Sequence, residues 1–276
     1  MAEGLPAPAA DPVGPALAVI RRSTEFVPSV GVILGSGLGD ALSDMEESVS
    51  FSFTELPGFP PSTVPGHDGR LVLGTSRGTP VAAFHGRVHY YEHHSMSKCS
   101  MTVRLAHALG AEAMVVTAAV GGLTPDVGPV AVVTDHVGLM GATPLAGWRF
   151  SDGSPAFIDV SAAYTPELVA IAKEAADELG IDLSPAIYAA VAGPAYETAA
   201  ESEFLRRSGA SVVGMSVVPE VAAACALGMD VLALCAVVNP AGTAIDHSEV
   251  VSVGRDIGAV ASRLLAAILP RLNPER

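Results

Sequence analysis

Short runs of apolar, mostly β-branched residues recur along this chain and alternate with segments of helical pattern. The strands that these runs predict cover residues 30–34, 71–73, 81–84, 114–117, 130–134, 187–191, 212–215 and 231–238. Several runs are apolar throughout, which is typical of strands buried on both faces of a sheet. The alternation predicts a single-domain α/β fold, with a central mostly parallel or mixed sheet flanked by helices.

The segments between these strands carry residues that begin and end helices. Thr165 stands at an expected N-cap, is followed by proline, and its helix should end before Gly180. Thr198 and Glu201 form a T-x-x-E capping box for the next helix. Two more helices are expected over residues 219–227 and 248–269.

The chain divides into a short tail and one domain. Residues 1–12 are rich in Ala, Pro and Gly and have no periodicity, so we expect a mobile N-terminal tail there and a single domain over residues 13–276. Of the 276 residues 50% are hydrophobic, a composition that excludes intrinsic disorder. A chain of this length buries enough surface to need no disulfide or metal for stability.

Charge and hydropathy exclude two classes of partner. The 15 Lys and Arg residues against 29 Asp and Glu residues give a net charge of −14, which disfavours binding to nucleic acid. The longest uncharged apolar run, residues 231–245, contains Asn239 and Pro240 and falls short of the roughly 18 apolar residues of a membrane span. With no secretory signal pattern and three cysteines in no paired spacing, we expect a cytoplasmic protein.

A glycine turn follows the first predicted strand. Residues 35–40 read GSGLGD and lead into an expected helix, so backbone N–H groups there can approach an anion. The turn is not a dinucleotide fingerprint, because the third glycine of that pattern falls on Asp40, nor a P-loop, because no Gly-Lys-Ser/Thr follows. A purely structural turn remains the alternative.

Residues 85–94, HGRVHYYEHH, place one arginine, four histidines and two tyrosines after an apolar strand. Arg87 and His89 alternate along an extended segment, so both can face one anion. His89, Glu92 and His93 also match the H-x-x-E-H pattern of zinc peptidases, which requires a helix. Gly86 and the β-branched and aromatic residues disfavour a helix here, so we expect no metal.

Three polar residues follow predicted strands, at the edge where α/β sheets bind ligands. Glu197 precedes the capped helix, where it can also simply complement the helix dipole. Ser216 ends its strand in Gly-Met-Ser, which is not a nucleophile elbow because Val218 replaces the last glycine. Asn239 ends the last strand, where a buried amide can read a ligand's hydrogen-bond pattern.

Taken together, several motifs make the chain resemble the trimeric purine nucleoside phosphorylases from about residue 25 to residue 270. These motifs are ILGSGLG, FPPSTVPGH, HGRVHYYE, GPAYETAAE, VVGMSVVPEV and the strand ending at Asn239. The resemblance implies a pentosyltransferase of purine salvage. It would cleave a purine nucleoside with inorganic phosphate to the free base and α-ribose 1-phosphate. It also implies a homotrimer with phosphate as co-substrate and no metal or organic cofactor.

The resemblance also implies the roles of individual residues. The phosphate site would comprise Ser36, His67, Arg87, His89, Ala119 and Ser216. The purine site would comprise Tyr196, Glu197, Val213 and Asn239. The ribose site would comprise Tyr91, Met215, His247 and, from the neighbouring subunit, Phe157. The catalytic residues among these would be His89, Glu197 and Asn239.

These roles agree with the chemistry of the reaction. Cleavage develops oxocarbenium character at the sugar and negative charge on the purine, so phosphate must be held beside the sugar and the base stabilised from its far edge. Glu197 would accept the purine N1–H, Asn239 would pair with N7 and O6, and Tyr196 would stack on the base. The expected substrates are the 6-oxopurine nucleosides inosine and guanosine and their deoxy forms.

The chain departs from the family pattern at several places. Ala118 stands where the family commonly has asparagine, and residues 135–138 lack an asparagine common after the histidine. Pro240 follows Asn239, and the loop from there to His247 is short. These departures concern the purine edge and the pocket for the 5′ end of the sugar.

Two other functions agree less well with the motifs. Methylthioadenosine phosphorylases share the fold and are similar at Thr117 and Ala118, but they carry aspartate in place of Asn239 and lack the pair Tyr196 and Glu197. A binding or regulatory protein that has lost catalysis is disfavoured, because nearly every matched functional position is filled. Phosphorolysis of 6-oxopurine nucleosides is the preferred hypothesis.

Overall fold

A mixed nine-stranded sheet dominates the structure, a computed structural model that describes residues 4–8, 12–35, 38–64, 67–243 and 247–272. Its strands are β1 (Val30–Leu34), β2 (Glu46–Ser52), β3 (Arg70–Ser76), β4 (Thr79–His85), β5 (Ala113–Gly122), β6 (Val130–Gly138), β7 (Leu183–Ala190), β8 (Val212–Gly214) and β9 (Asp230–Pro240). The helices are α1 (Gly14–Arg21), α2 (Met96–Cys99), α3 (Met101–Leu109), α4 (Pro166–Leu179), α5 (Ala199–Arg207), α6 (Val217–Ala226) and α7 (His247–Ile268).

The strand order is β2-β3-β4-β1-β5-β8-β7-β6-β9, and β9 also pairs with β5. Strands β5, β8, β7, β6 and β9 therefore close into a ring from which the other four extend. Parallel pairs join β1 to β4 and β5, β5 to β9, and β7 to β6 and β8. The remaining pairs are antiparallel. The predicted single-domain α/β fold with a mixed sheet is confirmed.

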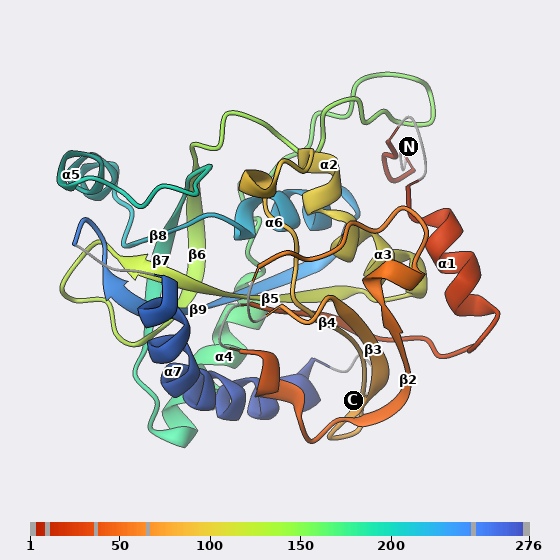
Figure 1. Cartoon of the computed structure of the whole chain (residues 1–276), viewed down its shortest axis with the longest axis horizontal. Helices are drawn as coiled ribbons and strands as arrows, with labels where there is room; N and C mark the ends of the chain where they lie inside the picture. The colour runs from red at the N-terminus through yellow and green to blue at the C-terminus, as the bar shows by residue number, and fades with distance from the viewer. Residues whose placement is uncertain (1–3, 9–11, 36–37, 65–66, 244–246, 273–276) are drawn as a thin grey trace.

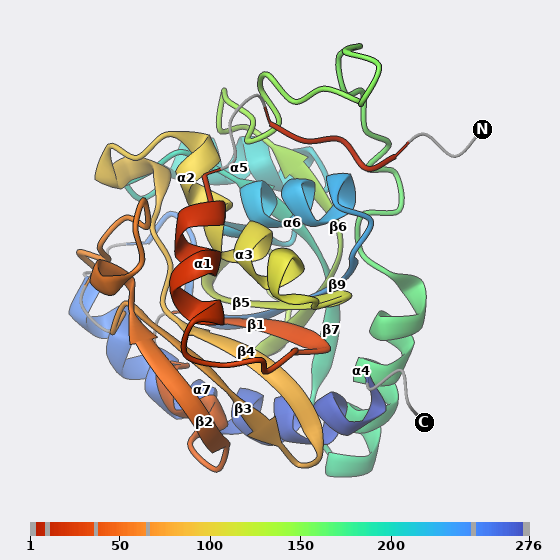
Figure 2. The same ribbon diagram turned by 90° about the vertical axis from the view of Figure 1, so that its right-hand side faces the viewer.

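Helices cover both faces of the sheet. Helices α1, α3 and α6 lie on one face and α4 and α7 on the other, as Figures 1 and 2 show from two directions. In β1, Val32 and Leu34 belong to the cluster with α4 and α7, whereas Ile33 belongs to the cluster with α3 and α6. Because alternate side chains point to opposite faces, a strand covered on both sides must be apolar throughout.

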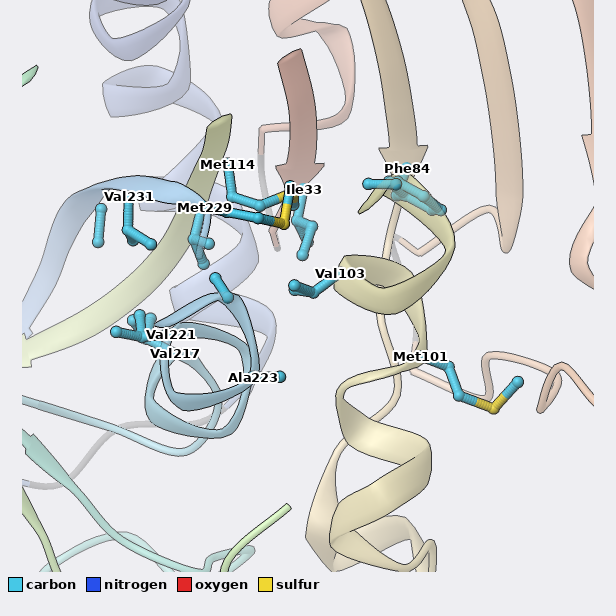
Figure 3. Close-up of a cluster of buried hydrophobic side chains, with 14 of the residues drawn as sticks. Ile33, Phe84, Met101, Val103, Met114, Val217, Val221, Ala223, Met229 and Val231 are labelled. Atoms are coloured by element: carbon cyan, nitrogen blue, oxygen red, sulfur yellow. The ribbon is translucent and has the colours of Figure 1, made fainter. Parts of the chain in front are cut away.

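The larger cluster fills the space between the sheet and helices α3 and α6. Figure 3 shows Ile33, Met114 and Met229 in that space, with Val103 of α3 and Val221 of α6. This face of the sheet matters for function, because the N-terminus of α6 meets the polar edge of the sheet.

The helix signals were largely informative. Helix α4 ends at Gly180, which has the left-handed conformation expected of a C-terminal glycine. The capping box of Thr198 and Glu201 is present at α5. Thr165 occupies the N-cap of α4, but its hydroxyl donates to Asp230 Oδ1 at 3.1 Å and ties the helix to β9 instead of capping it.

Two expectations about elements were wrong, and one edge strand was missed. The glycine turn leads into a short 3-10 turn, Gly39–Leu42, and not into an α-helix. Helix α6 begins at Val217, not at residue 219, which places Ser216 at its N-cap. Strand β2 was not predicted, because most of its residues are exposed and it lies at the edge of the sheet.

The N-terminal segment pairs with the loop between β6 and α4. Ala7 exchanges two backbone hydrogen bonds of 2.9 Å with Arg149, although the mobility of the tail as a whole stays a prediction. Across the described ranges no helix combines the length and apolar character needed to cross a bilayer.

Candidate active site

A cavity opens at one edge of the sheet, where the segment after β4 meets β5, β8, β9 and the loop before α5. It brings together ten of the predicted site residues, namely Arg87, His89, Tyr91, Ala119, Tyr196, Glu197, Val213, Met215, Ser216 and Asn239. Val120, Gly121, Gly214 and Val238 complete the described lining. Residues far apart in sequence therefore share one pocket, and they include members of all three predicted groups, for phosphate, purine and ribose.

Four predicted site residues are not part of the described lining. His67 lies directly behind His89, with the two rings stacked at 5.3 Å between centroids. Phe157 is 89% exposed in the long loop between β6 and α4. Ser36 lies outside the described residues, and His247 begins α7 with a side chain that is not described.

Arg87 is held by a carboxylate that the sequence had not singled out. Its Nε donates to Glu220 Oε1 at 2.8 Å and its Nη2 donates to Glu220 Oε2 at 3.2 Å. The Arg87 side chain is 2% exposed and that of Glu220 1%. Complete burial raises the pKa of Glu220, and the adjacent guanidinium opposes this rise. The two hydrogen bonds fix the plane of the guanidinium at the wall of the cavity.

His89 is oriented in a similar way by Glu92. The backbone N–H of His89 donates to Glu92 Oε1 at 2.7 Å, and His89 Nδ1 lies 2.9 Å from the same oxygen. The other carboxylate oxygen accepts the backbone N–H of Thr63 at 3.2 Å and also the Thr63 hydroxyl. Burial by itself raises the pKa of Glu92, but the hydrogen bonds from His89 and Thr63 outweigh it and lower the pKa to about 2.

His67 supports this arrangement as a neutral ring. Burial, with the positive charges of His89 and Arg87 nearby, lowers the pKa of His67 to about 3. Gly86 makes its close approach possible, because a Cβ there would lie 2.6 Å from the Cβ of His67 and the glycine has φ of +107°.

Ser216 adds the positive end of a helix dipole. It is the N-cap residue of α6, and its backbone N–H donates to the hydroxyl of Tyr188 at 3.3 Å. The first N–H groups of a helix attract anions. Arg87, His89 and the start of α6 thus place hydrogen-bond donors suited to an anion at one part of the cavity.

The loop before α5 contributes a hydrogen-bond acceptor to the cavity. Glu197 is half-buried, and burial raises the pKa of its carboxyl, with a further contribution from Glu201. It lies in the loop beyond β7, not at the strand end that the sequence indicated. Tyr196 beside it is 41% exposed and also lines the cavity.

Asn239 differs from expectation in burial. It lies near the end of β9, as predicted, but it is partly exposed, and its Nδ2 donates to the carbonyl of Pro240 at 3.0 Å. Ala118, the departure from the family pattern, is 2% exposed and packs in the core, while its neighbour Ala119 lines the cavity. The missing asparagine therefore changes the layer behind the pocket wall.

The zinc pattern has no helical backbone. His89 is extended, Tyr90–Glu92 form one 3-10 turn, and His93 has the left-handed conformation with φ of +63°. An H-x-x-E-H site requires both histidines on one face of an α-helix. In the portion of the chain that the structure describes, no three His, Cys, Asp or Glu side chains are grouped to hold a metal ion.

Two supporting residues were missed by sequence reasoning. Glu220 has a signal, because it is the one charged residue in the sequence of α6, VVPEVAAACA, and a buried charge requires a partner. Tyr188 has no local signal, because its apolar strand gives no reason to expect its hydroxyl beneath the start of α6.

Comparison with known proteins supports a single relationship. The profile of the Phosphorylase superfamily matches residues 29–270. Purine nucleoside phosphorylase 1 of Bacillus subtilis is 42% identical over 265 residues, which are 94% of this chain and 98% of the relative. Purine nucleoside phosphorylase of Mus musculus is 37% identical over 274 residues, 93% of this chain and 94% of the relative.

Solved structures agree with the sequences. Isoform 2 of purine nucleoside phosphorylase from Schistosoma mansoni, in complex with cytosine and ribose-1-phosphate, superposes with a TM-score of 0.88 at 32% identity, over 95% of this chain and 96% of that one. A schistosoma purine nucleoside phosphorylase in complex with hypoxanthine gives a TM-score of 0.86 at 30% identity, over 93% and 95% of the two chains. This chain belongs to the purine nucleoside phosphorylases of the phosphorylase superfamily.

Proposed function

We propose that this chain catalyses the reversible phosphorolysis of 6-oxopurine nucleosides to free base and (deoxy)ribose 1-phosphate. The observation that carries the proposal is the single cavity that combines an anion site at Arg87, His89 and Ser216 with the acceptor Glu197 and the amide Asn239. Hypoxanthine and ribose-1-phosphate, which are bound in the schistosoma complexes, are the products that inosine would give.

The anion site positions the attacking phosphate. Arg87 and His89, each held by a buried or half-buried carboxylate, would bind phosphate oxygens together with the N-terminus of α6. A phosphate oxygen forms the bond to C1′ of the sugar while the bond from C1′ to N9 of the purine breaks. Holding both reactants in one site supplies much of the rate enhancement through proximity.

The purine end stabilises the departing base. The electron pair of the broken bond is delocalised over the purine, where N7 and O6 become better acceptors. The Nδ2 of Asn239 carries two hydrogens, and since one is donated to Pro240, the other remains for N7 or O6. Donors aimed at developing negative charge are the main electrostatic contribution to catalysis of this kind.

Selectivity follows from the same groups. An ionised Glu197 only accepts hydrogen bonds, so it pairs with the N1–H of inosine or guanosine and faces a lone pair in adenosine. A site built for a donor rejects an analogue that lacks it. A structure of purine nucleoside phosphorylase from Schistosoma mansoni in complex with adenosine is also similar to this chain, with a TM-score of 0.85 and 31% identity. Adenosine is therefore a necessary comparison substrate.

The proposed working unit is a cytoplasmic homotrimer that uses no metal or organic cofactor. Phe157 would complete the ribose site of a neighbouring subunit, and its 89% exposure in the single chain leaves it accessible to such a partner. Light scattering of the purified protein gives the assembly. Phe157→Ala should raise the KM for inosine more than that for phosphate.

One assay tests the proposal. Ultraviolet spectra are followed with inosine, guanosine, adenosine and methylthioadenosine, each with and without phosphate. Phosphate-dependent cleavage of the first two, with much slower cleavage of the others, is expected. Cleavage of adenosine as fast as inosine would contradict the 6-oxopurine selectivity, and cleavage without phosphate would contradict phosphorolysis.

Variants locate the anion site. Arg87→Ala and His89→Ala each remove a hydrogen bond to a charged group, which costs about 1.5–3 kcal/mol, or roughly 10- to 150-fold in kcat/KM for phosphate. Arg77→Ala is the matched control, because Arg77 is an exposed arginine paired with Asp44 on the turn between β3 and β4. Unchanged phosphate saturation in both site variants would place the anion site elsewhere.

A further inference from the structure

Glu220 occupies a position in α6 that links two parts of the anion site. It lies four residues after Ser216, the N-cap, so the two residues are on the same side of the helix. Its carboxylate reaches Arg87, which lines the cavity beside Ser216. Helix α6 thus contributes its N-terminus to the cavity and also holds the guanidinium of Arg87 beside that N-terminus.

The pattern of donors on Arg87 shows what this contact leaves for a ligand. A guanidinium carries five N–H groups, and Glu220 takes the one on Nε and one on Nη2. Nη1 lies close to Gly35 at the end of β1, because a Cβ built on that glycine would be only 2.9 Å from it. Glu220 lies behind Arg87 and is not among the described residues that line the cavity.

We infer that Glu220 is a positioning residue for phosphate: its two hydrogen bonds orient Arg87 so that the Nη1 edge faces the anion beside the start of α6. This inference rests on the proposed function, since it requires phosphate to bind at Arg87. It assigns to Glu220 a role in phosphate affinity without any contact with phosphate.

Two simpler roles predict different results. If the pair served stability alone, apolar side chains of similar volume would serve equally well, and phosphate binding would not depend on Glu220. If Glu220 were only a counter-charge, its negative charge would weaken phosphate binding, and removing that charge would lower the KM for phosphate. If Glu220 orients Arg87, replacing Glu220 should instead raise the KM for phosphate.

The experiment measures KM for phosphate and for inosine in Glu220→Gln and Glu220→Asp. Glutamine keeps the length but replaces one acceptor by a donor that faces Nη2, and aspartate keeps the charge but is one methylene shorter. Since small misplacement of a binding group costs up to about 100-fold, both variants should raise the KM for phosphate roughly 10- to 100-fold. The KM for inosine should change less than about twofold. Glu203→Gln, an exposed glutamate paired with Arg206 and Arg207, is the matched control.

A second measurement separates positioning from loss of fold. If Glu220 acts through Arg87, adding Glu220→Gln to Arg87→Met should leave the KM for phosphate within about twofold of that of Arg87→Met alone. Melting curves establish that each variant is folded at the assay temperature, and if Glu220→Gln is not, Glu220→Asp decides. An unchanged or lowered KM for phosphate in the folded single variants, or a further rise in the double variant, would overturn the inference.

Failure of the inference differs from failure of the proposed function. Absence of phosphorolysis in the wild-type chain, or unchanged phosphate saturation in Arg87→Ala, would reject the proposed function or its phosphate site. Normal phosphorolysis that depends on Arg87 but not on Glu220 would reject the inference alone.

Discussion

The buried pair of Arg87 and Glu220 gives a prediction about stability that is independent of catalysis. Arg87→Met removes the counter-charge of a carboxylate that is 1% exposed. Removing one partner of a buried ion pair costs about 3–5 kcal/mol, because the remaining charge must stay unpaired or take up a proton. The free energy of unfolding at pH 8 should fall by this amount.

The loss should depend on pH in a defined direction. Burial raises the pKa of Glu220, and Arg87 opposes the rise, so the pKa in the folded variant is higher than in the wild type. A carboxyl whose folded pKa is raised contributes its full stability below the unfolded pKa, about 4.3, and loses it as pH rises toward the folded pKa. The deficit of Arg87→Met should therefore be smaller at pH 5 than at pH 8.

Urea unfolding followed by circular dichroism, at one fixed protein concentration, measures both effects. Arg87→Met/Glu220→Leu removes both charges and should recover the stability to within about 1 kcal/mol of wild type or exceed it, without restoring phosphate binding. Arg77→Ala, at an exposed pair, should cost less than about 0.5 kcal/mol. A deficit below about 1 kcal/mol for Arg87→Met at pH 8, or one that does not change with pH, would refute the reasoning.

Three further predictions concern other groups of the site. Asn239→Asp replaces a donor by an acceptor, so the adenosine-to-inosine ratio of kcat/KM should rise about tenfold or more, equivalent to about 1.4 kcal/mol; an unchanged ratio would remove Asn239 from the purine site. Hydrogen bonds lower the pKa of Glu92 to about 2, so its contribution is present above the unfolded pKa and is lost as pH falls toward 2. Glu92→Gln should accordingly lose more unfolding free energy at pH 7 than at pH 3, and equal losses would contradict this. Turnover should survive exhaustive chelation, and stoichiometric zinc whose removal abolishes turnover would instead favour the peptidase pattern.

The sequence located elements well where burial on both faces left a continuous apolar run. Each predicted strand has a counterpart, and β1 has its predicted bounds. Strand β2 was missed because an exposed edge strand needs no apolar run. The expected start of α6 is two residues late, because proline is typical of the first position of a helix, whereas here two valines precede Pro219 in the helix. Local propensity gives weak information at such boundaries.

The site was predictable to the extent that its residues belong to local motifs. Ten of the assigned residues line one cavity, although they come from five separate parts of the chain. Their individual roles stay predictions until the variants are measured. The expectation that Asn239 is buried was wrong, because the end of a strand beside an open cavity remains accessible to solvent.

By itself the sequence determined the buried strands, the two-sided burial of the sheet and the candidate site residues, because these depend on side-chain period and on local motifs. Only the tertiary structure decided which groups meet. The closure of the sheet through β5 and β9, and the pair of Arg87 with Glu220, join segments more than a hundred residues apart. The same holds for His89 and Glu92, which are only three residues apart. Because a 3-10 turn follows His89, Glu92 accepts a hydrogen bond from the His89 ring, and the two residues do not lie on a metal-binding α-helix. A hydrogen bond requires donor and acceptor within about 3 Å, and that distance is set by how the whole chain packs.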